Sequence, residues 1–208
     1  MYDYQQVIIR LRGAYSHESA QKRDNTDKEA WKITERQHFL TLLQQEGKTT
    51  LLEIGAGTGQ DSLFFQHNGL RVVCTDLSPA MVDLCRAKGL DAHIMDFLAL
   101  DFPPASFEAI YALNCLLHVP ACDLPTVLRK LRDLLRPGGL FFLGVYGGFE
   151  FEGVREQDWH NPPRFFSQHS DEFMQRVAAP FFELVSFKAI PMESKSYHFQ
   201  SMVLRRRE

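Results

Sequence analysis

The stretch Thr50–Ser62, with the sequence TLLEIGAGTGQDS, decides the fold of this chain. It opens with a mostly apolar run over 51–54 and continues with glycines at the alternate positions 55, 57 and 59, followed directly by an amphipathic segment. This order predicts a buried strand, a tight turn and the start of a helix, because glycine tolerates positive φ and lets a ligand approach the main chain. The first N–H groups of a helix point at whatever lies before it. The stretch therefore predicts a loop that binds a nucleotide-type cofactor.

The spacing of the glycines narrows the class of cofactor. A phosphate-binding loop carries Lys and Ser or Thr after its last glycine, whereas Gln60 and Asp61 follow here. A nicotinamide dehydrogenase is disfavoured because the GxGxxG spacing is missing. The acidic residues Glu53 and Asp61 flank the turn and suit a ligand that carries positive charge and an amino group. S-adenosylmethionine, with its sulfonium and α-ammonium groups, meets that requirement.

Length and composition exclude several other classes of protein. The chain has 208 residues, enough for one domain, and its net charge of -3 gives no overall basic field for nucleic acid. No apolar run approaches the roughly 20 residues that span a bilayer, and the N-terminus has no signal-peptide pattern. The four cysteines form no C-x-x-C pair, which favours reduced thiols in a cytoplasmic protein without a metal site.

Alternating strands and helices predict an α/β fold. We expect strands at 50–54, 71–75, 91–95, 107–113 and 140–145, with helices at 59–68, 79–88 and 123–135. Such an order gives a parallel sheet with helices on both faces. Residues 1–26 are polar and mixed and include the aromatic Tyr15. The helix predicted over 27–46 could close over the cofactor, with Arg36 meeting a carboxylate beside Trp31, although a packing residue and a surface charge explain these two equally well.

Acidic residues follow the second and third predicted strands. Asp76 lies about 20 residues after Gly55, the separation at which a carboxylate meets ribose hydroxyls in such folds. Asp76 could instead cap the next helix, but Ser78-Pro79 already supplies a cap and a first-turn proline. Asp96 could accept the adenine amino group while Phe97 covers the ring, or Asp96 could be a turn residue.

Residues 146–170 interrupt the alternation of strands and helices. We expect a long aromatic loop at the carboxyl end of a central strand, where open α/β sheets bind ligands. A short helix at 170–178 and an antiparallel pair of strands at 181–190 and 197–204, joined by a turn near 191–193, complete the chain. The candidate substrate residues are Tyr15, Trp31, Arg36, Tyr146, Trp159, His160, Arg164, Phe165 and Phe166.

Four motifs in this order resemble the class I S-adenosylmethionine-dependent methyltransferases. They are EIGAGTG at 53–59, VVCTDLSPAMV at 72–82, MDF at 95–97 and LRKLRDLLRPGGLFFLG at 128–144. The resemblance covers roughly residues 48–145 and implies a Rossmann-like, doubly wound sheet of seven strands in the order 3-2-1-4-5-7-6, with strand 7 antiparallel. It implies one domain over 1–208, made of an N-terminal lid (1–47), a cofactor-binding core (48–145), a substrate loop (146–170) and a C-terminal part (171–208).

The resemblance also implies roles for single residues. The turn with Gly55, Ala56, Gly57 and Gly59 faces the methionine part of the cofactor, and Glu53 and Asp61 flank it. Asp76 holds the ribose beside Leu77 and Met81, the pair Asp96 and Phe97 faces adenine, and Leu113, Asn114 and His118 lie near the methyl group. We expect His118 to be a catalytic base because histidine titrates near neutrality, with a packed or capping histidine as the alternative and His160 or His169 as other bases.

One departure from the family narrows the substrate. Amino-group methylases of DNA and of protein glutamine carry an Asn/Asp-Pro-Pro-aromatic motif after strand four, and this chain reads NCLLHVP there. The sequence therefore predicts methylation of an O or N atom of a small molecule, with S-adenosylhomocysteine as the product of the cofactor, in a cytoplasmic monomer or homodimer. Two alternatives stay open: an RNA or modified-nucleotide methyltransferase, which would need a basic patch such as Arg205–Arg207 with Lys188 and Lys195, and a non-catalytic cofactor-binding sensor.

Overall fold

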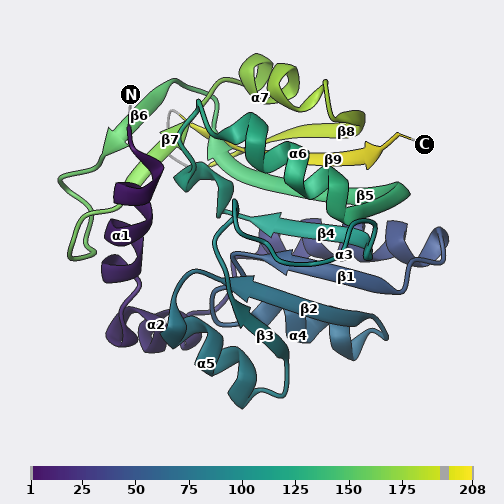
Figure 1. The fold of residues 1–208 in the computed structure, drawn as a ribbon, viewed down its shortest axis with the longest axis horizontal. Helices are drawn as coiled ribbons and strands as arrows, with labels where there is room; N and C mark the ends of the chain where they lie inside the picture. Colours follow the sequence, from purple (N-terminus) through teal and green to yellow (C-terminus); the bar gives the residue numbers. More distant parts are fainter. Residues whose placement is uncertain (1, 193–196, 208) are drawn as a thin grey trace.

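A seven-stranded sheet forms the centre of the computed structural model, which describes residues 2–192 and 197–207 (Figure 1). The strand order is β3-β2-β1-β4-β5-β9-β8. The strands are β1 (Thr50–Ile54), β2 (Arg71–Asp76), β3 (Asp91–Ile94), β4 (Phe107–Leu113), β5 (Leu135–Gly147), β8 (Phe182–Pro191) and β9 (His198–Arg206). The last strand runs antiparallel between β5 and β8. The predicted fold class and strand order are confirmed.

Helices cover both faces of the sheet (Figure 1). They are α1 (Tyr4–Ala14), α2 (His17–Asp24), α3 (Ala30–Gln45), α4 (Gln60–His67), α5 (Pro79–Ala87), α6 (Leu124–Leu134) and α7 (Asp171–Ala178), with the short 3-10 helix η1 (Leu116–His118). Side chains alternate between the faces of a strand, so Leu51 packs with residues of α3 and α4, whereas Leu52 packs with those of α1, α6 and α7. Among the described residues, no helix is long and apolar enough to cross a bilayer.

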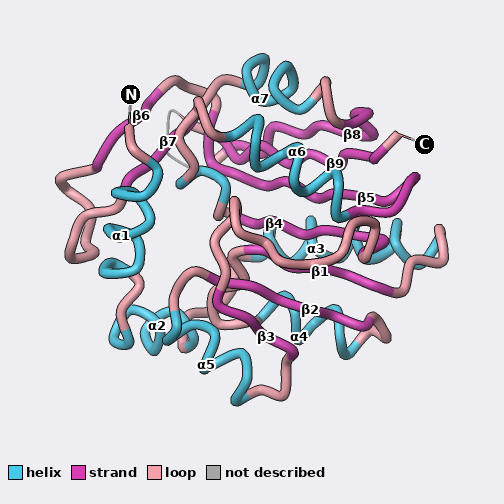
Figure 2. Tube along the Cα trace, viewed as in Figure 1, coloured by secondary structure: helices cyan, strands magenta, loops and turns pink. Residues whose placement is uncertain are grey.

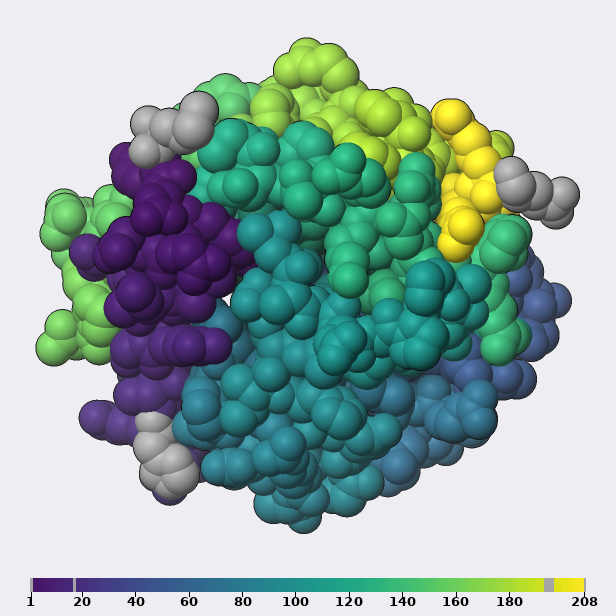
Figure 3. Space-filling view, in the orientation of Figure 1, coloured from purple at the N-terminus to yellow at the C-terminus, as the bar shows by residue number. Residues whose placement is uncertain are grey.

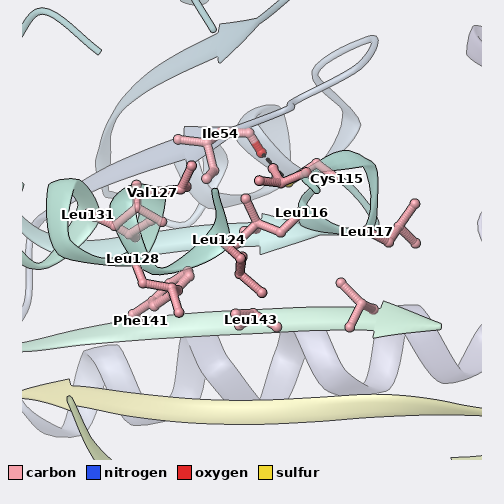
Figure 4. Close-up of a cluster of buried hydrophobic side chains, with 14 of the residues drawn as sticks. Ile54, Cys115, Leu116, Leu117, Leu124, Val127, Leu128, Leu131, Phe141 and Leu143 are labelled. Carbon is pink, nitrogen blue, oxygen red and sulfur yellow. Dashed lines mark hydrogen bonds between the residues drawn. The ribbon is translucent and has the colours of Figure 1, made fainter. Parts of the chain in front are cut away.

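A cluster of buried apolar side chains under α6 packs against β4 and against the segment that follows its carboxyl end. Figure 4 shows Leu124, Val127, Leu128 and Leu131 of α6 pointing toward the strands and toward η1, and these side chains are buried. The same view shows the Cys115 thiol donating to the carbonyl oxygen of Ile54, over 3.3 Å. The apolar stripe at i, i+3, i+4 and i+7 therefore fixes η1 beside the glycine turn.

The N-terminal segment differs from the expectation. Residues 1–26 contain the helices α1 and α2, and the helix predicted over 27–46 is α3. Asp3 caps α1 by accepting from the N–H of Gln5, and α1 buries Tyr4, Val7 and Leu11, among other residues. Figure 3 shows this segment, in purple, lying against the teal middle of the chain and beside the green segment of 151–168. Two short helices therefore cover the carboxyl ends of the parallel strands, where a single mixed segment was expected.

The segment 146–170 also differs, because it is not a simple loop. Residues Phe151–Val154 (β6) pair antiparallel with Phe165–Gln168 (β7) in a separate two-stranded sheet, which Figure 2 shows beside α1. The two prolines and the histidine between these strands obscured the pattern, since only four residues on each side form the ladder. The turn expected near 191–193 lies partly outside the described residues, as does Lys195.

Candidate cofactor and acceptor site

The glycine turn has the backbone that its sequence predicts. Gly55, Gly57 and Gly59 all have positive φ, between +57° and +78°. A Cβ on Gly55 would lie 2.3 Å from the Cβ of Cys115, and one on Gly59 would lie 2.6 Å from a methyl carbon of Leu90. Glycine is therefore required here for packing against η1 and α5 as well as for the left-handed backbone.

Asp76 connects the end of β2 to the glycine turn. One carboxylate oxygen accepts from the N–H of Gly57 over 2.8 Å, and the other accepts from the N–H of Ser78 over 2.9 Å. Burial raises the pKa of Asp76, and these two N–H donors oppose that rise. The hydroxyl of Ser78 caps α5 by accepting from the N–H of Met81. Asp76 is thus not the helix cap, and its carboxylate is available at the wall of a cavity.

A first, largely apolar cavity lies beside Asp76. The structure brings together there eight residues that the sequence predicted to bind a cofactor, namely Gly55, Gly57, Asp76, Leu77, Met81, Asp96, Phe97 and Asn114. Asp96 uses one carboxylate oxygen to accept from the N–H groups of Leu98 and Ala99. Its turn role is therefore real, and the carboxyl group still faces the cavity.

Sequence reasoning missed several residues of the same wall. Tyr4 and Leu11 reach the cavity from α1 and Arg23 reaches it from α2, while Met95 and Cys115 follow β3 and β4. The first three were missed because the two N-terminal helices were not expected. The spacing of Tyr4, Val7, Ile8 and Leu11 behind the capping residue Asp3 is the signal that would have predicted α1.

A second cavity of about 350 Å³ adjoins the first, since Tyr15, Arg23, Gly55 and Asn114 line both. The predicted cofactor residues Glu53, Ala56, Asp61 and Leu113 line it, together with the predicted substrate residues Trp159 and His160. Asn114 adopts a left-handed backbone at φ 55° and donates its N–H to the carbonyl oxygen of Gly144 over 2.7 Å. This residue turns the chain at the point where the two cavities meet.

The acidic residues beside the glycine turn are already engaged. Asp61 forms ion pairs with Lys28 and with Arg36, the latter over 2.9 Å. Arg36 also lies on the ring of Phe64, with 3.9 Å from its guanidinium carbon to the ring centre. Glu53 is buried and accepts from the hydroxyl of Ser62, and burial together with the charge of Asp61 raises the pKa of Glu53. Asp61 and Arg36 are therefore paired with each other, and Asp61 still lines the second cavity whereas Arg36 does not.

His118 is held as a neutral imidazole. Its Nδ1 lies 2.7 Å from the carbonyl oxygen of Phe165, which can only accept, so Nδ1 carries the proton. Its Nε2 then accepts from the hydroxyl of Tyr15 over 2.9 Å. Burial, together with the charge of Arg164, lowers the pKa of His118 to about 3, against the hydrogen bond to Phe165. The expectation that this histidine titrates near neutrality is wrong.

Arg164 and Asp158 hold in place Tyr15, the hydrogen-bond partner of His118. The guanidinium of Arg164 donates to both carboxylate oxygens of Asp158, over 2.7 and 3.0 Å, and to the hydroxyl oxygen of Tyr15 over 3.1 Å. The pKa of Asp158 lies well below its usual range because the hydrogen bonds and charge of Arg164 outweigh burial. Arg164, one of the candidate substrate residues, therefore orients Tyr15 through these hydrogen bonds.

The other predicted substrate residues divide into two groups. Trp159 and His160 lie at the second cavity with ring centres 3.7 Å apart, and Tyr15 meets the His160 ring edge-on at 5.3 Å. The remaining aromatic candidates, Trp31, Tyr146, Phe165 and Phe166, are absent from the described residues that line either cavity. Trp31 packs on Phe199, and Phe166 packs behind His118. Among the described residues, no group of three or more His, Cys, Asp or Glu side chains could hold a metal ion.

Residues 51–139 match the family model of the methyltransferase domain. The sheet order and the acidic residue after β2 agree with that match. Residues 51–139 are therefore similar to the class I S-adenosylmethionine-dependent methyltransferases. This match agrees with the family that the four motifs predicted and with its cofactor class.

Curated relatives match part of this chain. The malonyl-[acyl-carrier protein] O-methyltransferase of Serratia marcescens is 33% identical over 98 residues, which cover 46% of this chain and 37% of that protein. The ubiquinone biosynthesis O-methyltransferase of Xanthomonas campestris pv. campestris is 32% identical over 103 residues, which cover 46% of this chain and 42% of that protein. The match thus spans about two fifths of the length of these relatives.

Solved structures share the fold of this chain over most of its length. The 1,6-didemethyltoxoflavin-N1-methyltransferase of Burkholderia thailandensis, solved with 1,6-didemethyltoxoflavin and S-adenosylhomocysteine, has a TM-score of 0.79 and 22% identity, covering 100% of this chain and 92% of that one. A protein of Pyrococcus horikoshii has a TM-score of 0.69 and 14% identity, covering 87% and 93%. At these identities the likeness is one of fold.

Proposed function

We propose that this chain transfers the methyl group of S-adenosylmethionine to an O or N atom of a small molecule. The observation that carries the proposal is the meeting of the two cavities at Tyr15, Gly55 and Asn114, beside the carboxylate of Asp76. One cavity has the residues for an adenosine group, and the other has room for a methionine chain and an acceptor. The two O-methyltransferases and the N1-methyltransferase to which the chain is similar support the same class.

The cofactor is placed by four groups of residues in this proposal. Asp76 accepts from the ribose hydroxyls, while Asp96 and Phe97 hold adenine. The methionine chain crosses the glycine turn. Arg23 lies over that turn, since its Nε is 3.4 Å from the position of a Cβ on Gly57, and it has no ion-pair partner among the described residues. We assign Arg23 to the α-carboxylate of the cofactor.

Methyl transfer needs alignment more than proton chemistry. The sulfonium supplies the driving force, and the protein holds donor and acceptor in line. The neutral His118 keeps Tyr15 in one orientation at the junction of the cavities. We therefore assign His118 as a positioning residue rather than as the general base, and Tyr15 as the group that meets the acceptor.

The cations that the sequence offered for an RNA substrate are bound to other groups of the chain. Arg205 is paired with Glu46, Arg206 donates to the carbonyl oxygen of Leu135, and Lys188 is paired with Glu35. These cations thus already have partners within the chain. They contact α3 or lie at the edge of the sheet. We propose that nucleic acid is not the substrate, and that the chain acts as one cytoplasmic domain, in a monomer or a homodimer.

Radiolabel transfer tests the proposed function. S-adenosylmethionine labelled in its methyl group is incubated with the protein and a cell extract of the source organism, and the products are separated by size. We expect label in the small-molecule fraction. Label in RNA would contradict the proposal in favour of the nucleotide alternative, and absence of label together with cofactor binding would favour the non-catalytic sensor.

A further inference from the structure

Four cations and four carboxylates line the second cavity, and its net charge depends on how they pair and on which of them are ionised. The cations that line it are Lys22, Arg23, Lys28 and Lys32. Two of them are paired, Lys28 with Asp61 and Lys32 with Glu29. Asp61 also forms an ion pair with Arg36, which does not line the cavity. The buried ion cluster of Asp61 therefore carries a net positive charge.

The remaining charged side chains of the wall also leave a positive net charge. Burial raises the pKa of Glu53, which favours its neutral form. Among the described residues, Asp27 and Glu53 are the lining carboxylates without an ion pair, and the cations Lys22 and Arg23 of the same wall also have none. The methionine part of the cofactor adds a carboxylate, an ammonium and a sulfonium. An acceptor thus enters surroundings with a positive net charge, in which a cationic acceptor is repelled.

The wall toward solvent is aromatic and flat. Trp159 is 61% exposed, an unusual state for so large an apolar side chain, and it lies over the His160 ring. The ammonium of Lys22 stands 4.3 Å from the centre of the Trp159 ring. With Tyr15 at right angles to His160, these rings form an L-shaped wall that suits a planar molecule.

His118 is not free to remove a proton from an acceptor at this wall. Both nitrogens of His118 are occupied, by Phe165 and by Tyr15. His160 directs its Nδ1 at Asp158 over 3.3 Å, and burial together with Arg164 lowers its pKa. An acceptor that arrives as an anion needs no base for the transfer.

We propose that the methyl acceptor is a planar aromatic or heteroaromatic molecule that is anionic at neutral pH, and that it stacks at Tyr15, His160 and Trp159 with its negative charge toward Lys22. The inference rests on the proposed function and names its substrate class. In the transfer, a lone pair of the anion forms the new bond to the methyl carbon, and the C–S bond breaks with its electron pair going to sulfur. The cation and the anion become two neutral groups, and no proton or co-reactant is needed.

Calorimetry with three bicyclic probes of equal shape tests this inference. The protein is first titrated with S-adenosylhomocysteine, and the saturated complex is then titrated with 2-naphthoate, 2-naphthamide and 2-naphthylmethylammonium. We expect naphthoate to bind about tenfold more tightly than the amide, the worth of one partly exposed charge pair together with the field of the cavity, and the ammonium to bind most weakly. Equal affinities, tighter binding of the ammonium, or no binding of any probe would overturn the inference.

Two variants with a matched control locate the effect. Lys22→Glu is expected to remove the preference for naphthoate, whereas Arg129→Glu, which changes an exposed charge on α6, is expected to keep it. Trp159→Leu is expected to weaken all three probes several-fold by removing the stacking face. A preference that survives Lys22→Glu would contradict the placement. Failure of S-adenosylhomocysteine to bind would instead contradict the proposed function, so the two failures are distinguishable.

Discussion

Tyr15, His118 and Arg164 form a chain of hydrogen bonds in which each member has only one possible role. Phe165 can only accept at its carbonyl, so His118 must accept at Nε2, and Tyr15 must donate to it. Arg164 can only donate, so Tyr15 accepts from it. The direction of the Tyr15 hydroxyl at the junction of the cavities is therefore fixed before any ligand binds.

Residues of the cofactor site were predictable where one segment of chain carries the signal. Asp76 was found because a strand, a turn and a fixed separation from Gly55 place it. The roles of Asp61, Arg36 and Arg164 were not, since each depends on a partner from a distant part of the sequence. The pKa of His118 likewise depends on its burial under β7, which the sequence does not reveal.

Replacement of Asp76 by alanine should abolish most of the affinity for the cofactor. Asp76 provides two charged hydrogen bonds to the ribose in our account, so we expect S-adenosylhomocysteine to bind on the order of 100-fold more weakly in Asp76→Ala. Calorimetric titration gives the dissociation constant. The control is Asp83→Ala, which removes an exposed carboxylate of α5. Similar affinities in the two variants would refute the ribose role.

The pH dependence of unfolding should reveal the neutral His118. Its pKa of about 3 in the folded state lies below the ordinary 6.5, so the unfolded chain takes up a proton that the folded chain refuses as the pH falls below about 6.5. The stability that depends on a neutral His118 is therefore present above that pH. Between pH 7 and pH 5 we expect this residue to cost about 2 kcal/mol of unfolding free energy.

Urea unfolding of the wild type and of His118→Asn at both pH values isolates that contribution. The asparagine amide can still donate to the carbonyl of Phe165, but it does not titrate. The fall in unfolding free energy should thus be smaller in the variant by about 2 kcal/mol. Parallel curves for the two proteins would mean that His118 is protonated in the folded state near neutrality.

The glycine turn and the two N-terminal helices are the elements that build the site. The turn was predicted from its own residues, and its contact with η1 explains why Gly55 allows no side chain. The helices α1 and α2 were missed because their polar composition hides short amphipathic stripes. The hairpin of β6 and β7 was missed for a similar reason, since each strand has four residues and a long, proline-containing connection.

A pair of glycine replacements separates backbone strain from packing. Gly55 and Gly69 both have positive φ, at +61° and +89°, but a Cβ on Gly69 would meet nothing within 4 Å. We expect Gly69→Ala to cost about 1 kcal/mol of unfolding free energy, the strain alone. Gly55→Ala should cost about 2–4 kcal/mol, because its Cβ also collides with Cys115.

Chemical unfolding of both variants checks this expectation, with S-adenosylhomocysteine binding as a second readout. Gly69→Ala should bind like the wild type, since it lies beyond α4 and away from the cavities. Equal losses of stability in the two variants would show that the turn can relax away from η1.

The sheet as a whole explains where the ligands lie. Its parallel strands end together at β1, β2 and β4, and the N-terminal helices and the hairpin of β6 and β7 close that edge (Figure 1). The order of the strands was predictable from the family resemblance, because alternating strands and helices with a final antiparallel pair admit few arrangements. The way in which the N-terminal helices and the hairpin of β6 and β7 cover the ends of the strands was not predictable. It depends on packing between segments that lie far apart in the sequence.

Titration of the protein with S-adenosylmethionine, S-adenosylhomocysteine and NAD⁺ tests the central claim most directly. The account predicts that the first two bind with one molecule per chain, and that NAD⁺ does not compete, because the glycine turn lacks the spacing that holds a pyrophosphate. Binding of NAD⁺ in place of S-adenosylmethionine, or no heat with either methyl-donor compound, would contradict it.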